Sequence, residues 1–306
     1  MRFSLNQIMP WTEDFSFLST DNEMLVICNP QDSICESPVY QRSKKTLDEH
    51  IQFVNEKQIK KALVVGDNID FLRCCPSLEE LHIIPSFDAQ DFDFSPLYDL
   101  PNLRKLICQT MYGPEGNRIS YVDYSRLSSL EDLVINGVGH KNVDTLHRLK
   151  ALTFSGKQPA SKTLVGTFQS ADLEDLGIIE SPVSSLAGIE QSPKLKKITL
   201  AYNRNLEDIS ALECVGDTLT ELDIESCGKI KDFSVLKKLH KLEILRLIGK
   251  NVLPDLSFIR YMTNLKSFTF YMNASNGDLS MCLDIPFVQI QNRRHYSHKN
   301  EDFKKR

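Results

Sequence analysis

The most regular feature of the chain is a hydrophobic phrase that recurs along most of its length. The phrase is a leucine, two variable residues, a second leucine, one variable residue and a third apolar residue. Its clearest copies begin at Leu78, Leu130, Leu173, Leu195, Leu219, Leu242 and Leu265. Because apolar and variable positions alternate within it, the phrase has the period of a β-strand with one buried face. Each copy therefore predicts one short strand.

Strong and weak copies of this phrase follow one another from residue 59 to residue 292. They begin at Ile59, Leu78, Leu103, Leu130, Leu149, Leu173, Leu195, Leu219, Leu242, Leu265 and Ile285. Between Leu195 and Leu265 successive copies start 24, 23 and 23 residues apart, inside the range of about 20 to 29 that is typical of leucine-rich repeats. One such unit buries its apolar side only by stacking on the next. The pattern thus predicts a leucine-rich-repeat solenoid with about eleven strands.

A second phrase, Asp-apolar-Ser, follows many of the predicted strands. Its copies begin at Asp93, Asp123, Asp208, Asp232, Asp255 and Asp278. Asp and Ser side chains accept hydrogen bonds from the backbone of a turn. Later apolar residues such as Leu236, Leu239 and Leu242 are three apart, which favours short 3-10 turns. The predicted fold class is an α/β solenoid: a leucine-rich-repeat arc with a short-stranded parallel sheet on its concave face and 3-10 turns on its convex face.

Together the two phrases resemble the short-repeat leucine-rich class typified by bacterial internalins and the eukaryotic type-1 phosphatase regulator. Regular members of that class place Asn or Cys three residues after the last apolar residue of the strand. Here that position holds Asn203, Cys227 and Asn273, but also Ser86, Met111, Val138, Lys157, Ser181 and Lys250. The resemblance therefore implies a side-chain ladder that is broken in many turns. The segment Asn292 to Tyr296 also resembles the closing phrase of some bacterial cytoplasmic leucine-rich proteins.

We expect residues 1–58 to form an N-terminal α+β cap, because an open solenoid needs its first core layer covered. Thr46 and Glu49 form a capping-box pattern, which predicts a helix that runs to about Gln58. The apolar run from Met24 to Cys28 predicts a buried strand. Trp11 is expected to seal the cap. The predicted organisation is the cap at 1–58, the repeats at 59–292 and a basic tail at 293–306.

Charge is distributed unevenly along the chain. Its formal net charge is −5, whereas the tail from Arg293 carries six Lys or Arg against Glu301 and Asp302, a net +4, which leaves −9 for the rest. Such a tail is expected to be a solvated end. An acidic body argues against nucleic acid as the main ligand, since phosphate binding needs a basic surface.

The chain shows no segment of the length and hydrophobicity that a membrane span or a signal peptide needs. Eight cysteines are scattered without paired spacing, a distribution that favours reduced thiols. The sequence therefore predicts a cytoplasmic protein without membrane contact.

Catalytic and metal-binding motifs were sought and not found. The chain has no Gly-rich phosphate loop, no His-Glu-x-x-His, no Gly-x-Ser-x-Gly and no Cys-x-x-Cys, which are the spacings that carry phosphate, zinc, serine and redox chemistry. We expect no enzyme, no cofactor and no metal. An enzyme that uses Cys28, Cys35 or His50 is the remaining catalytic alternative.

Candidate binding residues are those that flank the leucines and face outward on the concave sheet. Glu221, Asp223 and Glu225 occupy alternate positions of one strand, with Arg246 as the nearby cation. Like charges this close favour a basic partner. Ile244, Ile248, Tyr271 and Phe287 form an apolar patch on the next three strands, of the kind that marks protein interfaces.

The sequence predicts a non-enzymatic module that binds a protein partner, of basic character, on this face. One alternative is an immunity or inhibitor protein that neutralises a basic toxin or nuclease. Another, implied by the phosphatase regulator, is a regulatory subunit that positions a catalytic partner. Against all three stands the possibility that the acids only maintain solubility and that a C-terminal extension or a crystal neighbour covers the patch.

Overall fold

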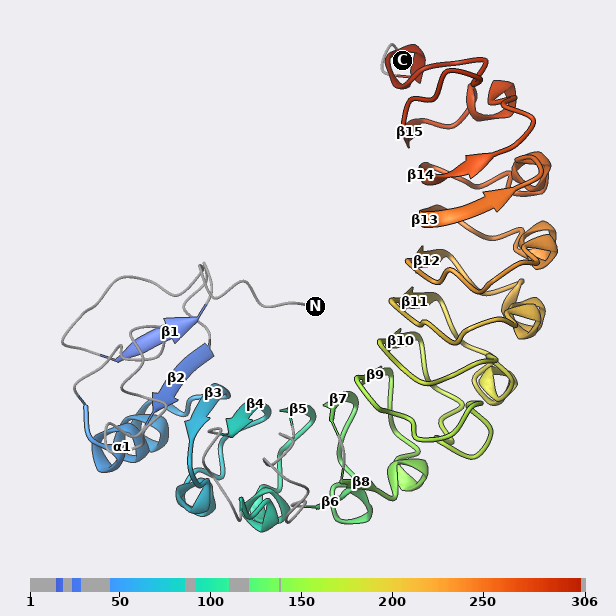
Figure 1. Cartoon of the computed structure of the whole chain (residues 1–306). Coiled ribbons are helices and arrows are strands. Elements are labelled where there is room, and N and C mark those ends of the chain that lie inside the picture. Colours follow the sequence, from blue (N-terminus) through green and yellow to red (C-terminus); the bar gives the residue numbers. More distant parts are fainter. Residues whose placement is uncertain are drawn as a thin grey trace. The chain divides into compact units, whose positions relative to one another are not determined.

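The computed structural model describes residues 15–18, 24–28, 45–85, 92–109, 121–137 and 139–303. The chain forms two compact units, residues 1–148 and residues 149–306. In each unit the strands lie along one side of the ribbon and the 3-10 turns along the other (Figure 1). Some residues with a predicted role lie outside the described residues: Trp11, Cys35 and the basic residues 304–306.

Unit 1 contains a sheet built in the order of the chain. Its elements are β1 (Ser16–Leu18), β2 (Met24–Cys28), α1 (Leu47–Lys57), β3 (Lys61–Gly66), β4 (Glu80–Pro85), β5 (Lys105–Gln109), β6 (Val122–Asp123), β7 (Asp132–Asn136) and β8 (His140–Lys141). β1 pairs with β2 antiparallel, and β2, β3, β4, β5 and β7 then pair in parallel. The short strands β6 and β8 form a separate parallel pair.

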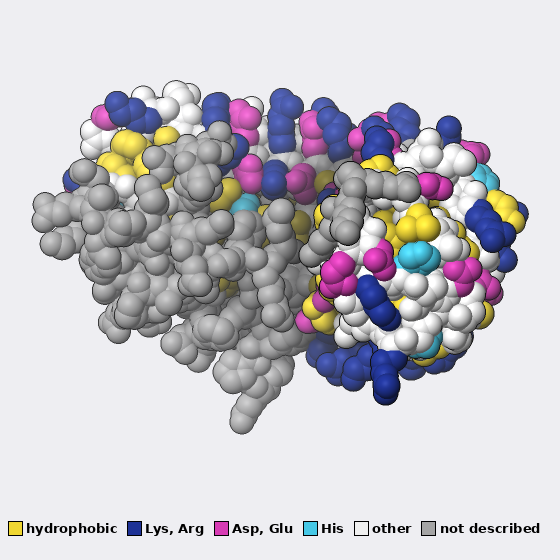
Figure 2. All heavy atoms as spheres, turned by 90° about the horizontal axis from the view of Figure 1, so that it is seen from above, with side chains coloured by type: hydrophobic (Ala, Val, Ile, Leu, Met, Phe, Trp, Pro, Cys, Tyr) yellow, Lys and Arg dark blue, Asp and Glu magenta, His cyan; other side chains and the backbone are white. Residues whose placement is uncertain are grey.

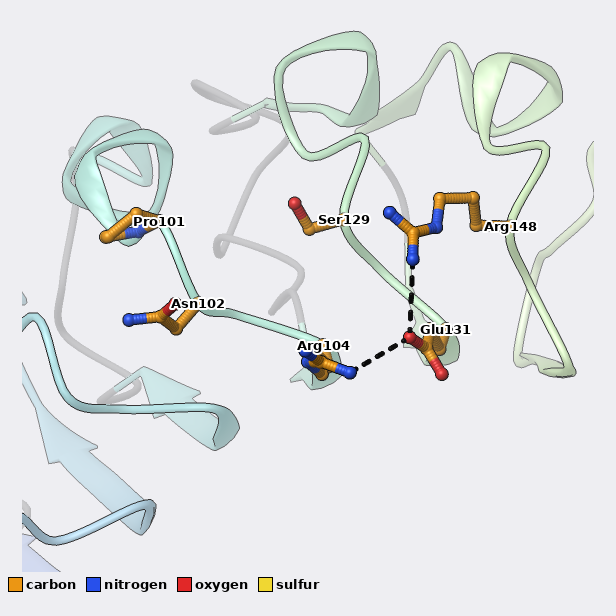
Figure 3. A pocket seen from close by; sticks show the side chains of 6 residues that line it. All are labelled: Pro101, Asn102, Arg104, Ser129, Glu131 and Arg148. Atoms are coloured by element: carbon orange, nitrogen blue, oxygen red, sulfur yellow. Dashed lines mark hydrogen bonds and ion pairs between the residues drawn. The ribbon is translucent and has the colours of Figure 1, made fainter.

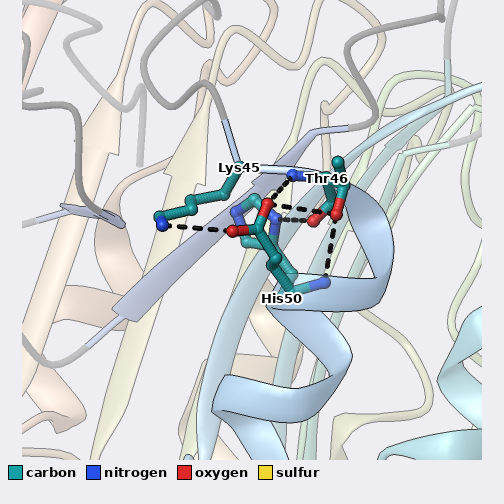
Figure 4. A network of polar contacts seen from close by, with 4 residues as sticks. Lys45, Thr46 and His50 are labelled. Atoms are coloured by element: carbon teal, nitrogen blue, oxygen red, sulfur yellow. Dashed lines mark hydrogen bonds and ion pairs between the residues drawn. The ribbon is translucent and has the colours of Figure 1, made fainter.

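Helix α1 begins as its sequence predicts. The backbone N–H of Glu49 donates to Thr46 Oγ1 at 3.3 Å, and the backbone N–H of Thr46 donates to Glu49 Oε2 at 2.8 Å. Both halves of the capping box are therefore present (Figure 4). Lys45 adds an ion pair to Glu49 at 3.1 Å. The helix ends before Gln58, which has a left-handed backbone, so the predicted start and end are confirmed.

Unit 2 is the more regular of the two. Its strands are β9 (Ala151–Ser155), β10 (Asp175–Ile179), β11 (Lys197–Ala201), β12 (Glu221–Glu225), β13 (Ile244–Leu253), β14 (Ser267–Ala274) and β15 (Phe287–Ile290). All seven described strands pair in parallel with their sequence neighbours, and the register aligns equivalent leucines such as Leu222 with Leu245. In both units each predicted repeat start is followed two residues later by a strand. The fold class predicted from the sequence is confirmed.

The Asp-apolar-Ser phrase forms the turn expected of it. In each described copy the serine N–H donates to the aspartate carboxylate, for example at 2.9 Å in Asp208–Ser210 and 2.7 Å in Asp255–Ser257. A 3-10 turn follows at once in both. These hydrogen bonds lower the pKa of the aspartates, that of Asp208 among them.

The side-chain ladder between turns is more complete in unit 2 than the sequence predicts. Asn203 is fully buried, donates to Ile178 O at 2.7 Å and accepts from Ser181 N at 2.9 Å. In the second half of β13 the predicted position, Lys250, is exposed, and Asn251 is buried instead. Asn251 donates to Ile230 O at 2.9 Å. A bulge between Ile248 and Val252 shifts the register by two residues, so Asn251 fills the ladder position and the gap expected at Lys250 was wrong.

The C-terminal segment closes the end of unit 2. Tyr296 is buried, and its hydroxyl accepts from Ala274 N at 3.1 Å and donates to Met272 O at 3.3 Å. Asn300, in the turn Asn300–Phe303, accepts a hydrogen bond from Ile290 N at 2.9 Å, on the last strand. Seen from above, this end shows mostly polar and charged side chains (Figure 2). Tyr296 and Asn300 therefore pack the tail against β14 and β15, while Arg294 and most of the other side chains up to residue 303 are exposed or half-buried.

Candidate functional site

The eight predicted site residues lie on four neighbouring strands, β12 to β15. The register places Glu221 beside Ile244, Asp223 beside Arg246 and Glu225 beside Ile248. We call Glu221, Asp223 and Glu225 the carboxylate column. The concave sheet face is the face that carries these residues, and its side chains alternate along each strand with the buried leucines.

The apolar patch, Ile244, Ile248, Tyr271 and Phe287, is divided into two rows. Ile248 lies directly beside Tyr271. Ile244 and Phe287 are in a parallel row, with Ser267 between them. The rows are four residues apart along the strands, about 13 Å. Phe287 is 55% exposed, and the other three side chains are half-buried. The structure thus brings Ile248 and Tyr271 together and keeps Phe287 apart from them.

The carboxylate column has more neighbours than the sequence predicts. Arg246 Nη1 lies 3.9 Å from Asp223 Oδ2, as expected. Lys197 Nζ on β11 also lies 4.0 Å from Glu221 Oε2 and 3.6 Å from Asp175 Oδ2. The expectation that Arg246 is the main nearby cation was therefore wrong, because parallel stacking places the preceding repeat's lysine beside Glu221.

Tyr202 is a site residue that sequence reasoning missed. It follows β11, is 45% exposed, and donates its hydroxyl to Glu225 Oε1. Its φ of 57° is left-handed, a conformation that is rare for a bulky residue. Glu180 and Ser226 have the same conformation directly after β10 and β12, so it belongs to the turn of the repeat and is not specific to Tyr202. The sequence signal was an aromatic residue at a turn position that holds Gly156 and Gly249 elsewhere, both with positive φ.

Ion pairs between strand starts are a second feature that was missed. Residues at or directly before the starts of neighbouring strands carry opposite charges, and their side chains pair at 3.2 Å for Glu80–Lys105, 2.9 Å for Glu174–Lys196 and 2.7 Å for Glu243–Lys266. Positive and negative side chains alternate along the upper margin of the space-filling view (Figure 2). The sequence signal was the charge of the residue directly after each repeat start, which changes from positive to negative between successive repeats from Lys60 to Lys196. These pairs set strand register rather than offer a binding surface.

The sheet face of unit 1 differs from that of unit 2. Met24, Val26, Leu63 and Val65 occupy the positions that alternate with the core leucines, yet all four are buried and form one apolar cluster. Strands buried on both faces have continuous apolar sequences, as Met24–Cys28 does. The accessible apolar side chains that were predicted as a binding patch therefore belong to unit 2.

A small pocket of about 80 Å³ lies in unit 1. Arg104 and Arg148 both approach the same oxygen of Glu131, at 3.4 and 3.8 Å (Figure 3). Pro101, Asn102 and Ser129 complete its lining. Because Glu131 already neutralises part of the positive charge and both arginines are exposed, the arrangement is a surface ion pair of modest strength.

Of the three residues held as a catalytic alternative, Cys28 and His50 are described, and neither is placed as a free nucleophile or base. His50 is buried and its Nδ1 bonds Thr46 O at 2.8 Å (Figure 4). Cys28 is disulfide-bonded, which corrects the expectation of reduced thiols at this position. Burial raises the pKa of the Cys75 thiol to about 11 and that of Cys282 to about 12, which disfavours the reactive thiolate. Within the described residues, no group of three His, Cys, Asp or Glu side chains could hold a metal ion, and no helix could cross a bilayer.

Comparison with known proteins supports the fold. No protein-family model matches the chain. The internalin inlF from Listeria monocytogenes superposes with a TM-score of 0.52 at 16% identity, over 89% of this chain and 83% of that one. An internalin C2 from the same organism superposes with a TM-score of 0.42 at 20% sequence identity, over 60% of this chain and 76% of that one. The mouse RP105/MD-1 complex superposes with a TM-score of 0.40 at 16% sequence identity, over 69% of this chain and 42% of that one. At such identities the likeness shows the fold alone: the chain has a leucine-rich-repeat fold.

Proposed function

We propose that this leucine-rich-repeat chain is a non-enzymatic scaffold that binds a protein partner on the concave sheet face of unit 2. The observation that carries the proposal is the exposed apolar patch on that face, above all the half-exposed Phe287 and the adjacent pair Ile248 and Tyr271. Sheet faces that only meet water carry polar side chains. Apolar and aromatic side chains in a polar rim are typical of protein interfaces.

The proposed partner is basic. The carboxylate column borders the patch directly through the register with β13. Lys197 and Arg246 neutralise it in part, at distances of 3.9 to 4.0 Å that are longer than hydrogen bonds. A negative border of this kind steers a positive partner and rejects an acidic one.

The test is capture from the source organism with mass-spectrometric identification. Changing Glu221, Asp223 and Glu225 together to Lys should reduce capture of the specific partner by at least about tenfold, because like charges then face each other. Glu207, Glu213 and Asp217, all exposed and outside the site, provide a matched control with the same change in net charge. Equal capture by the two triple variants would show that the column takes no part in binding.

The apolar patch needs a separate variant. Ile248→Arg places a charge beside Tyr271 without touching the core leucines. We expect it to abolish capture, while Val165→Arg, at an exposed apolar residue away from the sheet, leaves capture unchanged. Undiminished binding by Ile248→Arg would refute the proposed face.

A second candidate is favoured by the carboxylate column: an immunity or inhibitor protein that neutralises a basic toxin or nuclease in the cytoplasm. Co-expression with a toxin encoded nearby should then protect cells, and the triple Lys variant should not. If a folded catalytic partner copurifies instead, the chain is a regulatory subunit of the kind that positions an enzyme. Protection and copurification therefore separate the two alternatives.

A further inference from the structure

The turn that follows β14 contains an asparagine–glycine pair, Asn276–Gly277. Asparagine before glycine is the pair most prone to spontaneous deamidation, because glycine has no side chain that shields its own backbone nitrogen. Asn276 is exposed, and Gly277 has a left-handed φ of 68°. Among the described residues, the side-chain nitrogen of Asn276 has no hydrogen-bond partner, whereas its Oδ1 has one. The group that leaves in deamidation is therefore unrestrained and in contact with water.

The hydrogen bonds of this turn favour the reaction. In deamidation the backbone nitrogen of Gly277 attacks Cγ of Asn276, and negative charge develops on Oδ1. The backbone N–H of Asp278 donates to that oxygen at 3.1 Å, and a fixed donor of this kind stabilises the developing charge. The N–H of Gly277 donates to Ala274 O at 3.2 Å, the long end of the normal range. Little is therefore lost when this nitrogen reacts.

A second asparagine–glycine pair, Asn136–Gly137, has different surroundings. Asn136 is the last residue of β7, is half-buried and pairs with Gln109 on β5. Its carbonyl oxygen accepts from His140 Nε2 at 3.2 Å. These contacts hold the backbone on both sides of Asn136, and the attack requires that backbone to rotate. Asn136 is therefore an internal control for Asn276.

The Asn276–Gly277 turn also holds the C-terminal segment. The backbone N–H of Ser297 donates to Gly277 O at 2.8 Å, and that of Leu279 donates to Ser297 Oγ at 2.9 Å. A Cβ atom on Gly277 would overlap His295 O, so the two pieces of backbone are in close contact. Lengthening the main chain at this turn would displace the hydrogen bonds that close the end of unit 2.

We propose that Asn276 is a site of spontaneous deamidation and that the reaction loosens the C-terminal segment from unit 2. The Gly277 nitrogen loses its proton to hydroxide and bonds to Asn276 Cγ. The bond from Cγ to Nδ2 breaks, and Nδ2 takes up a proton and leaves as ammonia. Water then opens the five-membered succinimide ring and gives aspartate or isoaspartate. Isoaspartate adds one methylene group to the main chain between residues 276 and 277.

The experiment is incubation of the full chain at pH 7, 8 and 9, followed by proteolysis and mass spectrometry of both asparagine–glycine peptides. We expect Asn276 to convert at least about tenfold faster than Asn136, because an oxyanion donor is worth that much or more. The rate should rise with pH, since the attack needs the deprotonated Gly277 nitrogen. Conversion at Asn276 that is no faster than at Asn136, or that is independent of pH, would overturn the assignment of the site.

Asn276→Gln is the matched variant, because its longer side chain would have to close a less favourable six-membered ring. Hydrogen exchange of residues 295–303 should accelerate at least about tenfold in the isoaspartate form of the wild-type chain and stay unchanged in incubated Asn276→Gln. Asn276→Asp adds the charge without the methylene group and should exchange like fresh protein. Normal protection in the isoaspartate form, or equal acceleration in Asn276→Asp, would show that the longer main chain does not loosen the segment.

Discussion

At the scale of single residues, burial of polar side chains determines which repeats stack well. Asn203 satisfies one backbone carbonyl and one N–H of the neighbouring turn from a fully buried position. Asn251, two repeats later, donates to two backbone carbonyls, Cys227 O and Ile230 O, while its own Oδ1 is buried without a partner. Its neighbour Lys250 holds the position that the repeat spacing indicates. Buried backbone groups need such partners. Residue type alone therefore identifies ladder positions only where the strand is regular.

Replacing Asn203 with Ala should lower the free energy of unfolding by about 2–4 kcal/mol, because two buried backbone groups lose their partner. Lys250→Ala should change it by less than about 0.5 kcal/mol, as an exposed side chain does. Urea titrations of both variants measure the difference. If Lys250→Ala proved the more harmful, Lys250 and not Asn251 would hold the ladder position in β13.

At the scale of elements, polar pairs join one turn or strand to the next. In unit 1, Tyr124 in the turn Tyr124–Arg126 bonds His140 Nδ1 on β8 at 2.9 Å, and His140 Nε2 bonds Asn136 O at 3.2 Å. A neutral imidazole satisfies both contacts, with Nε2 as donor and Nδ1 as acceptor. Burial lowers the pKa of His140 to about 4. This pair makes the contact between the two elements sensitive to pH.

The free energy of unfolding should therefore fall as the pH drops from about 6.5 to 4. In that window the unfolded chain binds a proton at His140 and the folded chain does not, so stability present above pH 6.5 is lost at up to about 1.4 kcal/mol per pH unit. Urea titrations near pH 7 and pH 5 test this. The variant His140→Gln should show a smaller slope, and an unchanged slope would contradict the assignment. Glu80, with its lower pKa, contributes only below about pH 4.5.

At the scale of the whole molecule, stability is the sum of contacts between neighbouring repeats within each unit. Among the described residues, no repeat follows β15, the last strand of unit 2. The C-terminal segment takes that place through Tyr296 and Asn300. The same logic applies to α1 and the first strands of unit 1, where the capping helix precedes β3. Each unit thus depends on a non-repeating segment at its outer end.

Tyr296→Ala should lower the free energy of unfolding by about 3–5 kcal/mol, the usual effect of removing a buried aromatic ring. Hydrogen exchange should accelerate first in β14 and β15, its direct neighbours, and leave β10 and β11 protected. Arg294→Ala is the control, since Arg294 is exposed in the same segment. Uniform acceleration across unit 2 would instead indicate one cooperative block.

The sequence by itself determined the repeat, the strand after each start, the capping box of α1 and the Asp-Ser turns. These are local features: Thr46 and Glu49 are three residues apart, and Asp255 and Ser257 only two. It also determined which residues face outward on β12 to β15, because side-chain direction alternates along a strand.

Only the tertiary structure decided what lies beside those residues. Four features depend on how neighbouring repeats lie against each other. They are the bulge that buries Asn251 in place of Lys250, the approach of Lys197 to Glu221, the Tyr202–Glu225 contact and the unpartnered Oδ1 of Asp223. Contacts between repeats depend on how strands stack, and a shift of one residue reverses which side chain is buried. The carboxylate column was therefore visible in the sequence, whereas the buried, unpartnered oxygen within it was visible only in the fold.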